Sequence, residues 1–282
     1  MAHRQRNIQM FALRHPPAEE VTVAGVPYRL VHVFKHDFYA ATCLYEATGP
    51  ADIPKIVVKF GRENDFAGLP LSWLSHWHRD RIRAIYEALD GVPGIPRWLG
   101  CVGELGFAIE YIESRPLDHS PPPPPGFFDK LKSLFDAVHD RGVAYCDSNK
   151  RSNILIGADG QPYLIDYQLS FRSGSHLPWL IRPIVRGAFR YMCGKDMYHL
   201  FKHKRRMCPD ELRPEEDALS GRPVGVHLVH RKLAKFYRAI RRQFLRTQHE
   251  KGQLVSPTAD LEGHYQPEKA TWRTTSRVGA PK

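Results

Sequence analysis

The sequence predicts an α+β protein with two lobes: a small lobe built on an antiparallel β-sheet with one helix, and a larger, mainly helical lobe. Segments rich in β-branched and aromatic residues fill the first part of the chain, and amphipathic helical patterns dominate the later part. A short hairpin pattern lies near the middle. The 282 residues are enough for two such lobes with buried cores.

Composition and charge narrow the class of protein. Hydrophobic residues make up 42% of the chain and charged residues 25%, as in ordinary globular proteins. The net charge of +11 favours an anionic partner such as nucleotide, nucleic acid, acidic lipid or lipopolysaccharide, although charge can also serve solubility alone. The 5 cysteines are scattered without a C-x-x-C pair, which indicates reduced thiols in a cytoplasmic protein. We expect neither a secretory signal nor a membrane span.

The patterns divide the chain into four segments. Residues 1–20 are polar and basic, which predicts a loose arm or a short helix. Residues 21–112 are expected to form the small lobe and residues 113–247 the large lobe, while the polar residues 248–282 predict a poorly ordered tail. The expected strands are Val21–Val23, Tyr28–Phe34, Phe38–Tyr45, Lys55–Phe60, Trp98–Val102 and Phe107–Ile112. The expected helices are Leu71–Leu89, one with the apolar face Phe128, Leu131, Phe135 and Val138, and Val229–Arg246.

The stretch His139–Phe171 holds the residues that predict chemistry. Two short apolar runs flank the turn signal Ala158–Gly160, which predicts a β-hairpin. Such a hairpin would bring Asn153, at its entrance, close to Asp166, at its exit. Oxygen ligands of this kind suit Mg²⁺, which leaves its other positions to phosphate and water. Asp147 precedes the hairpin and could accept a proton from an attacking hydroxyl.

This order of acid, amide and acid is the layout of a protein-kinase catalytic loop followed by its metal-binding aspartate. The plainer alternative is that both aspartates cap turns and that Asn153 bonds its own backbone. The combination of three such residues with the strand pattern in the right order favours the kinase layout.

Lys59 is expected to hold the phosphates of ATP. It lies inside a β-branched strand pattern, where a lysine is costly to bury unless it is paired. A surface lysine with a buried stem is the alternative, and Lys55 is the competing residue nearer the strand edge. In a kinase a helix acid pairs with this lysine. The candidates are Asp80 and Glu87; we favour Asp80 because Glu87 lies near the helix end, and each is also compatible with a solvated surface charge.

Other nucleotide contacts follow from the same layout. The link Lys35–Asp37 stands where a kinase has its glycine-rich loop, but it contains no glycine. Lys35 and His36 could supply charge there instead, and an ordinary polar hairpin turn is the equal alternative. Backbone groups from Glu110 to Ile112 are expected to bond adenine at the hinge.

A basic stretch follows the hairpin. Between Arg182 and Arg206 there are eight Lys or Arg residues and one acid, Asp196. The pattern is compatible with a basic amphipathic helix, spanning 182–206, that docks on an anionic membrane surface, and equally with a solvated helix face. Asp196, alone among bases, is expected to bond the backbone of the catalytic loop.

The chain resembles the bacterial lipopolysaccharide kinases of the Kdo/WaaP type, a branch of the protein-kinase-like superfamily, over roughly residues 28–206. The resemblance rests on LVHVFKHDFYAATCLYE, IVVKF, GVPGIP, YCDSNKRSNILI and LIDYQLSF, where Gln168 replaces the glycine of protein kinases. It implies a two-lobed kinase-like fold and transfer of phosphate from ATP, with Mg²⁺, to a hydroxyl of a sugar or glycolipid. By position it implies phosphate binding by Lys59, a base at Asp147, metal binding by Asn153 and Asp166, and a bracing role for Asp196.

Departures from the kinase pattern keep other functions open. Tyr145 and Cys146 stand where protein kinases have His and Arg, and Asp147 and Asn153 are six positions apart instead of five. The extra residue could displace Lys150, which otherwise could steady the γ-phosphate. A Ser/Thr protein kinase and a catalytically silent nucleotide-binding protein are the alternatives. No nucleic-acid partner is expected, since no aromatic platform or docking motif supports one. We expect a cytoplasmic enzyme, with a peripheral position on the inner face of the inner membrane as a further option.

Overall fold

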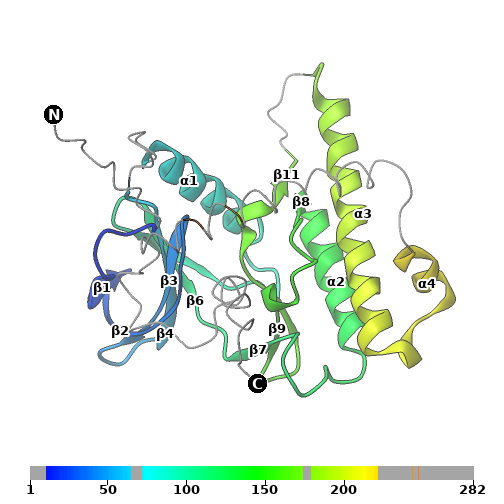
Figure 1. The fold of residues 1–282 in the computed structure, drawn as a ribbon, viewed down its shortest axis with the longest axis horizontal. Coiled ribbons are helices and arrows are strands. Elements are labelled where there is room, and N and C mark those ends of the chain that lie inside the picture. The colour runs from blue at the N-terminus through cyan, green and yellow to red at the C-terminus, as the bar shows by residue number, and fades with distance from the viewer. Residues whose placement is uncertain (1–10, 65–71, 174–178, 222–242, 244–246, 248–282) are drawn as a thin grey trace, which may run out of the picture. The chain divides into compact units, whose positions relative to one another are not determined.

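The structure is a computed structural model that describes residues 11–64, 72–173, 179–221, 243 and 247 (Figure 1). The chain divides into two compact units, each described by itself below. Unit 1 comprises Met1–Arg79, Leu99–Ile109 and Pro223–Lys282, and unit 2 comprises Asp80–Trp98 and Glu110–Arg222.

Unit 1 is built on a six-stranded sheet with the strand order β1-β2-β3-β4-β6-β5. Strands β1 to β4 form consecutive antiparallel pairs and lie side by side in Figure 1. Ala24 and Gly25, both with positive φ, form the two-residue turn between β1 and β2, which suits the twist of a tight hairpin. The strands are β1 (Glu20–Val23), β2 (Val26–His36), β3 (Ala40–Ala47), β4 (Lys55–Gly61), β5 (Trp98–Val102) and β6 (Gly106–Glu110).

The core of unit 1 comes from one face of this sheet. Alternate residues of β4 are buried, with Ile56 and Val58 fully enclosed, as a strand with one face on a core requires. Ala12 and Leu13 are also buried, and the amide of Ala12 donates to the Asp37 carbonyl at 2.8 Å. The expectation of a loose arm or a short helix is therefore wrong for residues 11–19, because apolar side chains there join the sheet's core.

Unit 2 contains the predicted hairpin. Strand β9 (Ile154–Gly157) pairs antiparallel with β10 (Pro162–Leu164), with Ile154 opposite Leu164. Strand β7 (Ser114–Pro116) pairs with the other edge of β9, and β8 (Val143–Ala144) pairs with β11 (Phe171–Arg172). The amphipathic helix α2 (Phe127–Asp140) buries the predicted apolar face, and its Phe135 is fully enclosed. Helix α1 (Ser72–Ala88) is also as predicted, and the boundary between the units falls inside it.

Helix α3 (Arg182–Met207) has two different halves. Its second half is packed: Asp196, Leu200 and Lys204 are all 1% exposed or less. The Lys204 ammonium lies 2.8 Å from both Asp129 of α2 and Glu216 of α4 (Pro214–Ser220), so it joins three helices. Burial alone would lower the pKa of Lys204, but the two carboxylates outweigh it and raise the pKa. The expected surface helix 182–206 is thus a surface helix only in its first half.

Several expectations fall outside the described residues. These are the tail 248–282 and the helix Val229–Arg246, of which the structure describes position 243 alone and assigns it to helix. Within the part of the chain that the structure describes, none of the helices has the length and apolar character needed to cross a bilayer.

Candidate active site

Asp147 is held in a buried position just before the hairpin. It is 8% exposed, and its Oδ2 accepts a hydrogen bond from the Asn153 amide at 2.8 Å. The ammonium of Lys150 lies 2.7 Å from the same oxygen. Burial raises the pKa of the Asp147 carboxyl, while Lys150 and Asn153 act in the opposite direction. A carboxylate with a raised pKa is a stronger base than an ordinary aspartate, which suits proton abstraction.

The mouth of the hairpin is closed by backbone bonds and by one tyrosine. The amide of Ile165 donates to the Asn153 carbonyl at 3.1 Å, which joins the chain entering β9 to the chain leaving β10. The Tyr145 hydroxyl donates to the carbonyls of both Asn153 and Ile165. These bonds place Asn153 and Asp166 at the same end of the hairpin, as the sequence predicted.

Asn153 is fixed in a metal-compatible orientation. It is buried in the 3₁₀ turn Arg151–Asn153, and its amide nitrogen is the donor to Asp147. Because the nitrogen makes that contact, the atom that remains for a cation is the amide oxygen, a hard ligand of the kind Mg²⁺ takes.

Asp166 has a left-handed backbone with φ of 67°. Non-glycine residues rarely adopt this conformation, and aspartate tolerates it better than most residues. The charge of Asp166 contributes to raising the pKa of Asp147, so the two carboxylates share one neighbourhood. Two such acids are easiest to hold ionised when a cation lies near them. The chain after Asp166 is anchored from α1, because the Arg81 guanidinium donates to the carbonyls of Gln168 and Ser170.

Asp196 braces the loop that carries Asp147. It is fully buried, and its two oxygens accept from the backbone amides of Tyr145 at 2.8 Å and Cys146 at 3.0 Å. The Ser148 hydroxyl donates to it at 2.9 Å, and His139 lies 3.2 Å away. The expectation that Asp196 bonds the loop backbone is confirmed.

The phosphate-binding candidates belong to unit 1. Lys59 lies in β4 opposite Thr42 of β3, on the face away from the core residues Ile56 and Val58. Lys55 lies on the same face, opposite Glu46, where a strand pair of opposite charge is favourable. The position opposite Glu46 gives Lys55 a structural role in the sheet. Lys59 therefore stays the candidate for binding ATP phosphates.

The link between β2 and β3 is an ordered turn. Asp37 accepts from the amides of Tyr39 at 2.7 Å and Ala40 at 3.0 Å, and Lys35 lies 2.5 Å from Asp37. His36 is buried, and its Nε2 accepts the amide of Leu13 at 3.1 Å. For His36 the structure favours the plain turn over a phosphate contact, because its side chain is buried and its Nε2 is used by the Leu13 amide.

The remaining candidates lie in unit 2. The Glu110 amide donates to the backbone carbonyl of Arg97 at 2.9 Å, and the Glu110 carboxylate pairs with the Arg97 guanidinium at 3.2 Å. Ile112 lies in the following loop, half-buried. Of the two helix acids, Asp80 is exposed on α1, and Glu87 pairs with Arg83 at 2.7 Å. This ion pair on the exposed face of α1 accounts for Glu87 without a contact to Lys59.

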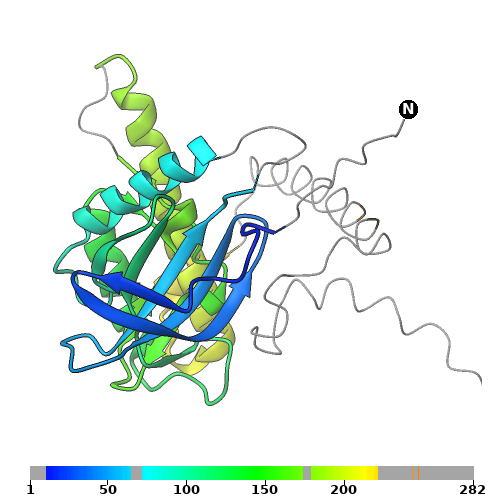
Figure 2. The same ribbon diagram turned by 90° about the vertical axis from the view of Figure 1, so that its left-hand side faces the viewer.

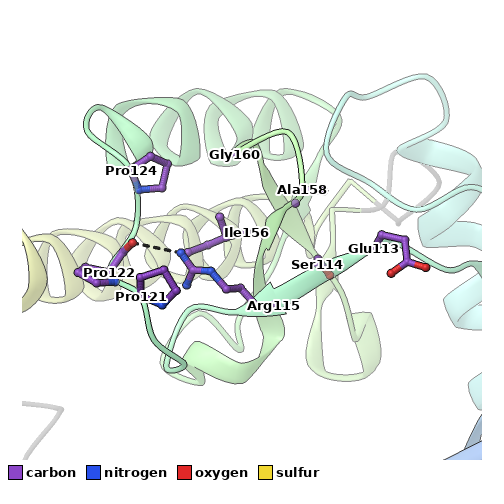
Figure 3. A pocket seen from close by; sticks show the side chains of 10 residues that line it. Glu113, Ser114, Arg115, Pro121, Pro122, Pro124, Ile156, Ala158 and Gly160 are labelled. Atoms are coloured by element: carbon purple, nitrogen blue, oxygen red, sulfur yellow. Dashed lines mark hydrogen bonds between the residues drawn. The ribbon is translucent and has the colours of Figure 1, made fainter.

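A pocket of about 550 Å³ lies beside the turn of the hairpin, at the end opposite to Asn153 and Asp166 (Figure 3). The prolines at 121, 122 and 124 line it, together with Gly157, Ala158 and Gly160 of the hairpin turn. The Arg115 guanidinium reaches across to the Pro122 carbonyl at 3.1 Å. None of the predicted catalytic, metal or nucleotide residues lines this pocket.

Tyr145 and Arg81 have positioning roles that the sequence did not predict. In the sequence Tyr145 stands out only because protein kinases have a histidine there. Its hydroxyl bonds the carbonyls of Asn153 and Ile165, which are 8 and 20 positions away. Arg81 reaches a carbonyl 87 positions away. A tyrosine directly before a predicted catalytic loop was a usable signal, whereas nothing local distinguishes Arg81 from the other arginines of its helix.

No protein-family model matches the chain, and no curated protein matches it. Among solved structures, the chain is similar to Rio2 kinase from Chaetomium thermophilum in its ADP/Mg²⁺-phosphoaspartate complex, with 15% identity and a TM-score of 0.48. That match covers 66% of this chain and 57% of the kinase. A second Rio2 kinase structure from the same organism matches with 16% identity and a TM-score of 0.44, covering 60% of this chain and 54% of that one. The chain thus spans little more than half of either kinase.

The fold is α+β, and its elements follow the order that the sequence analysis expected of a kinase-like fold: an antiparallel-sheet unit, a helix between β4 and β5 in the chain, and a mainly helical unit that carries the β9–β10 hairpin.

Proposed function

We propose that this chain is a kinase that uses ATP and Mg²⁺ to phosphorylate a hydroxyl of a lipopolysaccharide-type sugar or glycolipid. The observation that carries the proposal is the assembly of Asp147, Asn153 and Asp166 at one hairpin mouth, on a loop anchored by Asp196. Phosphoryl transfer needs positioned charges more than covalent chemistry, and in this proposal the mouth would hold a base, Asp147, beside two oxygen ligands for the metal.

The donor set fits Mg²⁺, which takes one or two protein oxygens and leaves its other positions to phosphate and water. When bound, the ion neutralises phosphate charge. Asp166 and the Asn153 amide oxygen would hold it, while Asp147 would orient the acceptor hydroxyl and take its proton. The nucleotide contacts in this proposal are Lys59 and Lys35 for phosphates, Lys150 for the γ-phosphate, the Glu110–Ile112 backbone for adenine, and Asp80 as the partner of Lys59.

The acceptor class is supported by the motif Ile165–Gln168, which resembles the Kdo/WaaP-type lipopolysaccharide kinases. The structure adds a reason why a glutamine is tolerated where protein kinases have glycine: Gln168 lies in a short 3₁₀ turn, and its carbonyl accepts from Arg81 at 2.9 Å. A turn of this kind makes no use of glycine's conformational freedom.

The experiment is transfer of ³²P from ATP with Mg²⁺, offering lipopolysaccharide core or lipid-A-linked sugar beside a generic protein substrate. We expect label on the glycolipid. Asp147→Ala should abolish this label and keep nucleotide binding, whereas Asp166→Ala should also lose Mg²⁺-dependent binding. The matched control is Asp136→Asn, a carboxylate of α2 paired with Lys132 at 2.7 Å, which should leave transfer unchanged.

Other outcomes point elsewhere. Label on protein alone would assign the chain to the Ser/Thr kinases. Absence of label, with ATP still raising the melting temperature, would favour a silent nucleotide-binding protein. Undiminished transfer by Asp147→Ala would refute the base assignment.

A further inference from the structure

The first turns of α3 and the residues just before them expose large apolar side chains. Trp179 is 74% exposed, Leu180 65% and Ile184 72%. In both ribbon views α3 continues past the end of α2, which accounts for this exposure (Figure 1, Figure 2). We call residues 179–191 the α3 tip. Scattered apolar residues are common on protein surfaces, but several neighbouring ones at the end of a protruding helix mark an interaction site.

The charge of the α3 tip has one sign. Between Tyr167 and Lys195 the sequence has no Asp or Glu, while it has five Lys or Arg residues. Arg186 and Arg190 are exposed and lie one turn apart on the helix. At 100° per residue, Ile184 falls on the opposite side of the helix from these arginines. The α3 tip is therefore a basic amphipathic segment with an exposed apolar face.

The second half of the same helix shows that this exposure is local. Leu200 and Phe201 are buried, and Lys204 is paired with two carboxylates. Among the described residues of α3, the large exposed apolar side chains all lie in the α3 tip, in a stretch whose charged residues are all basic. Of the segment 182–206 that the sequence offered for membrane docking, only the part within the α3 tip, residues 182–191, has these properties.

We propose that the α3 tip docks on the surface of a bilayer that contains anionic lipids, with Trp179, Leu180 and Ile184 entering the headgroup boundary. Exposed apolar side chains favour a partner with a hydrophobic phase, and the exposed Arg186 and Arg190, in a stretch of sequence that has no Asp or Glu, favour negative headgroups. Nucleic acid would satisfy the arginines but would offer no place for Leu180 and Ile184. The docking goes beyond the proposed kinase activity and does not depend on it, because the test below uses neither ATP nor an acceptor.

The test is co-sedimentation of the full chain with vesicles of phosphatidylcholine alone and with vesicles of phosphatidylcholine and phosphatidylglycerol in equal amounts. We expect binding to the anionic vesicles and little binding to the neutral ones, with weaker binding at high salt. Trp179→Ser with Ile184→Ser should abolish binding. Arg186→Glu should weaken it about fivefold or more, since each basic residue near an anionic surface contributes that order of affinity.

The matched controls are Trp73→Ser, an exposed tryptophan of α1 at 64%, and Arg206→Glu, an exposed arginine at the other end of α3. Both should bind vesicles as the wild type does. Circular dichroism and thermal unfolding check that each variant is folded. Absence of binding by the wild type, or equal loss in the controls, overturns the proposal. It is also overturned if the double serine variant still binds vesicles, or if it instead changes the chain's oligomeric state, which would assign the α3 tip to a protein contact.

Discussion

Two buried aspartates of unit 2 have different surroundings. Asp196, in the middle of α3, is fully buried and accepts from two backbone amides and a serine hydroxyl, with a histidine beside it. Asp147, in the loop before the hairpin, is 8% exposed, accepts at one oxygen from an amide and an ammonium, and has the carboxylate of Asp166 in its neighbourhood. Donors at both oxygens make Asp196 a structural anchor, whereas burial with fewer donors raises the pKa of Asp147, as the proposed role of a base requires.

Replacement of Asp147 by asparagine should have the largest effect on activity. Asp147→Asn removes the base, and we expect turnover to fall by about 10²–10⁴-fold, the usual contribution of a positioned base. Turnover is measured with ATP and the acceptor identified by the transfer experiment. A variant with wild-type turnover would show that Asp147 is not the base.

The same variant should fold at least as stably as the wild type. Asparagine can place its own oxygen where Oδ2 accepts from Asn153 and Lys150. The raised pKa means that ionised Asp147 costs stability, so its neutral replacement should raise the free energy of unfolding slightly at neutral pH. The gain should vanish as the pH falls through that raised pKa, because Asp147 is then neutral as well. Urea denaturation at several pH values measures this.

Asp196→Asn should have the opposite effect on stability. Both oxygens of Asp196 accept hydrogen bonds, so the new amide nitrogen must face donors, for example the amide of Tyr145 or of Cys146. We expect a loss of about 3 kcal/mol in the free energy of unfolding, as for other broken buried networks. Turnover should fall in parallel because the loop loses its anchor. Equal stability of the two asparagine variants would remove the distinction between the two aspartates.

Local patterns explain which parts of this site the sequence could predict. The hairpin, the mouth positions of Asn153 and Asp166 and the strand lysine Lys59 follow from apolar alternation and turn residues, which act over a few positions. The contact of Arg81 with Gln168 joins residues 87 positions apart, and no local pattern encodes it. The burial of His36 likewise depends on the backbone of Leu13, a partner in a distant segment.

Tyr145→Phe should lower the free energy of unfolding by less than Asp196→Asn does, whereas Asp147→Asn should not lower it. It removes the hydroxyl that donates to Asn153 and Ile165, and it keeps the ring that packs 5.2 Å from Tyr167. We expect a loss of about 1–2 kcal/mol in the free energy of unfolding, because the buried carbonyl of Asn153 and the partly buried carbonyl of Ile165 lose a donor. Turnover should fall by about tenfold as the hairpin mouth loosens, with a higher Mg²⁺ requirement. The control is Tyr163→Phe, whose hydroxyl bonds the exposed Asp159 and should matter little.

The smallest expected effect is a displacement of the pH profile. Burial raises the pKa of Asp147, so kcat/KM should fall on the acid side at a pH above the ordinary range of aspartate. Lys150 pulls this pKa down, and Lys150→Met should therefore move the acid limb to still higher pH. Lys202→Met, which removes an ammonium that donates to Asn149 of the same loop at 3.4 Å, should leave the limb in place. A limb that moves equally in both variants would mean that general charge, and not the ammonium bonded to Asp147, sets its ionisation.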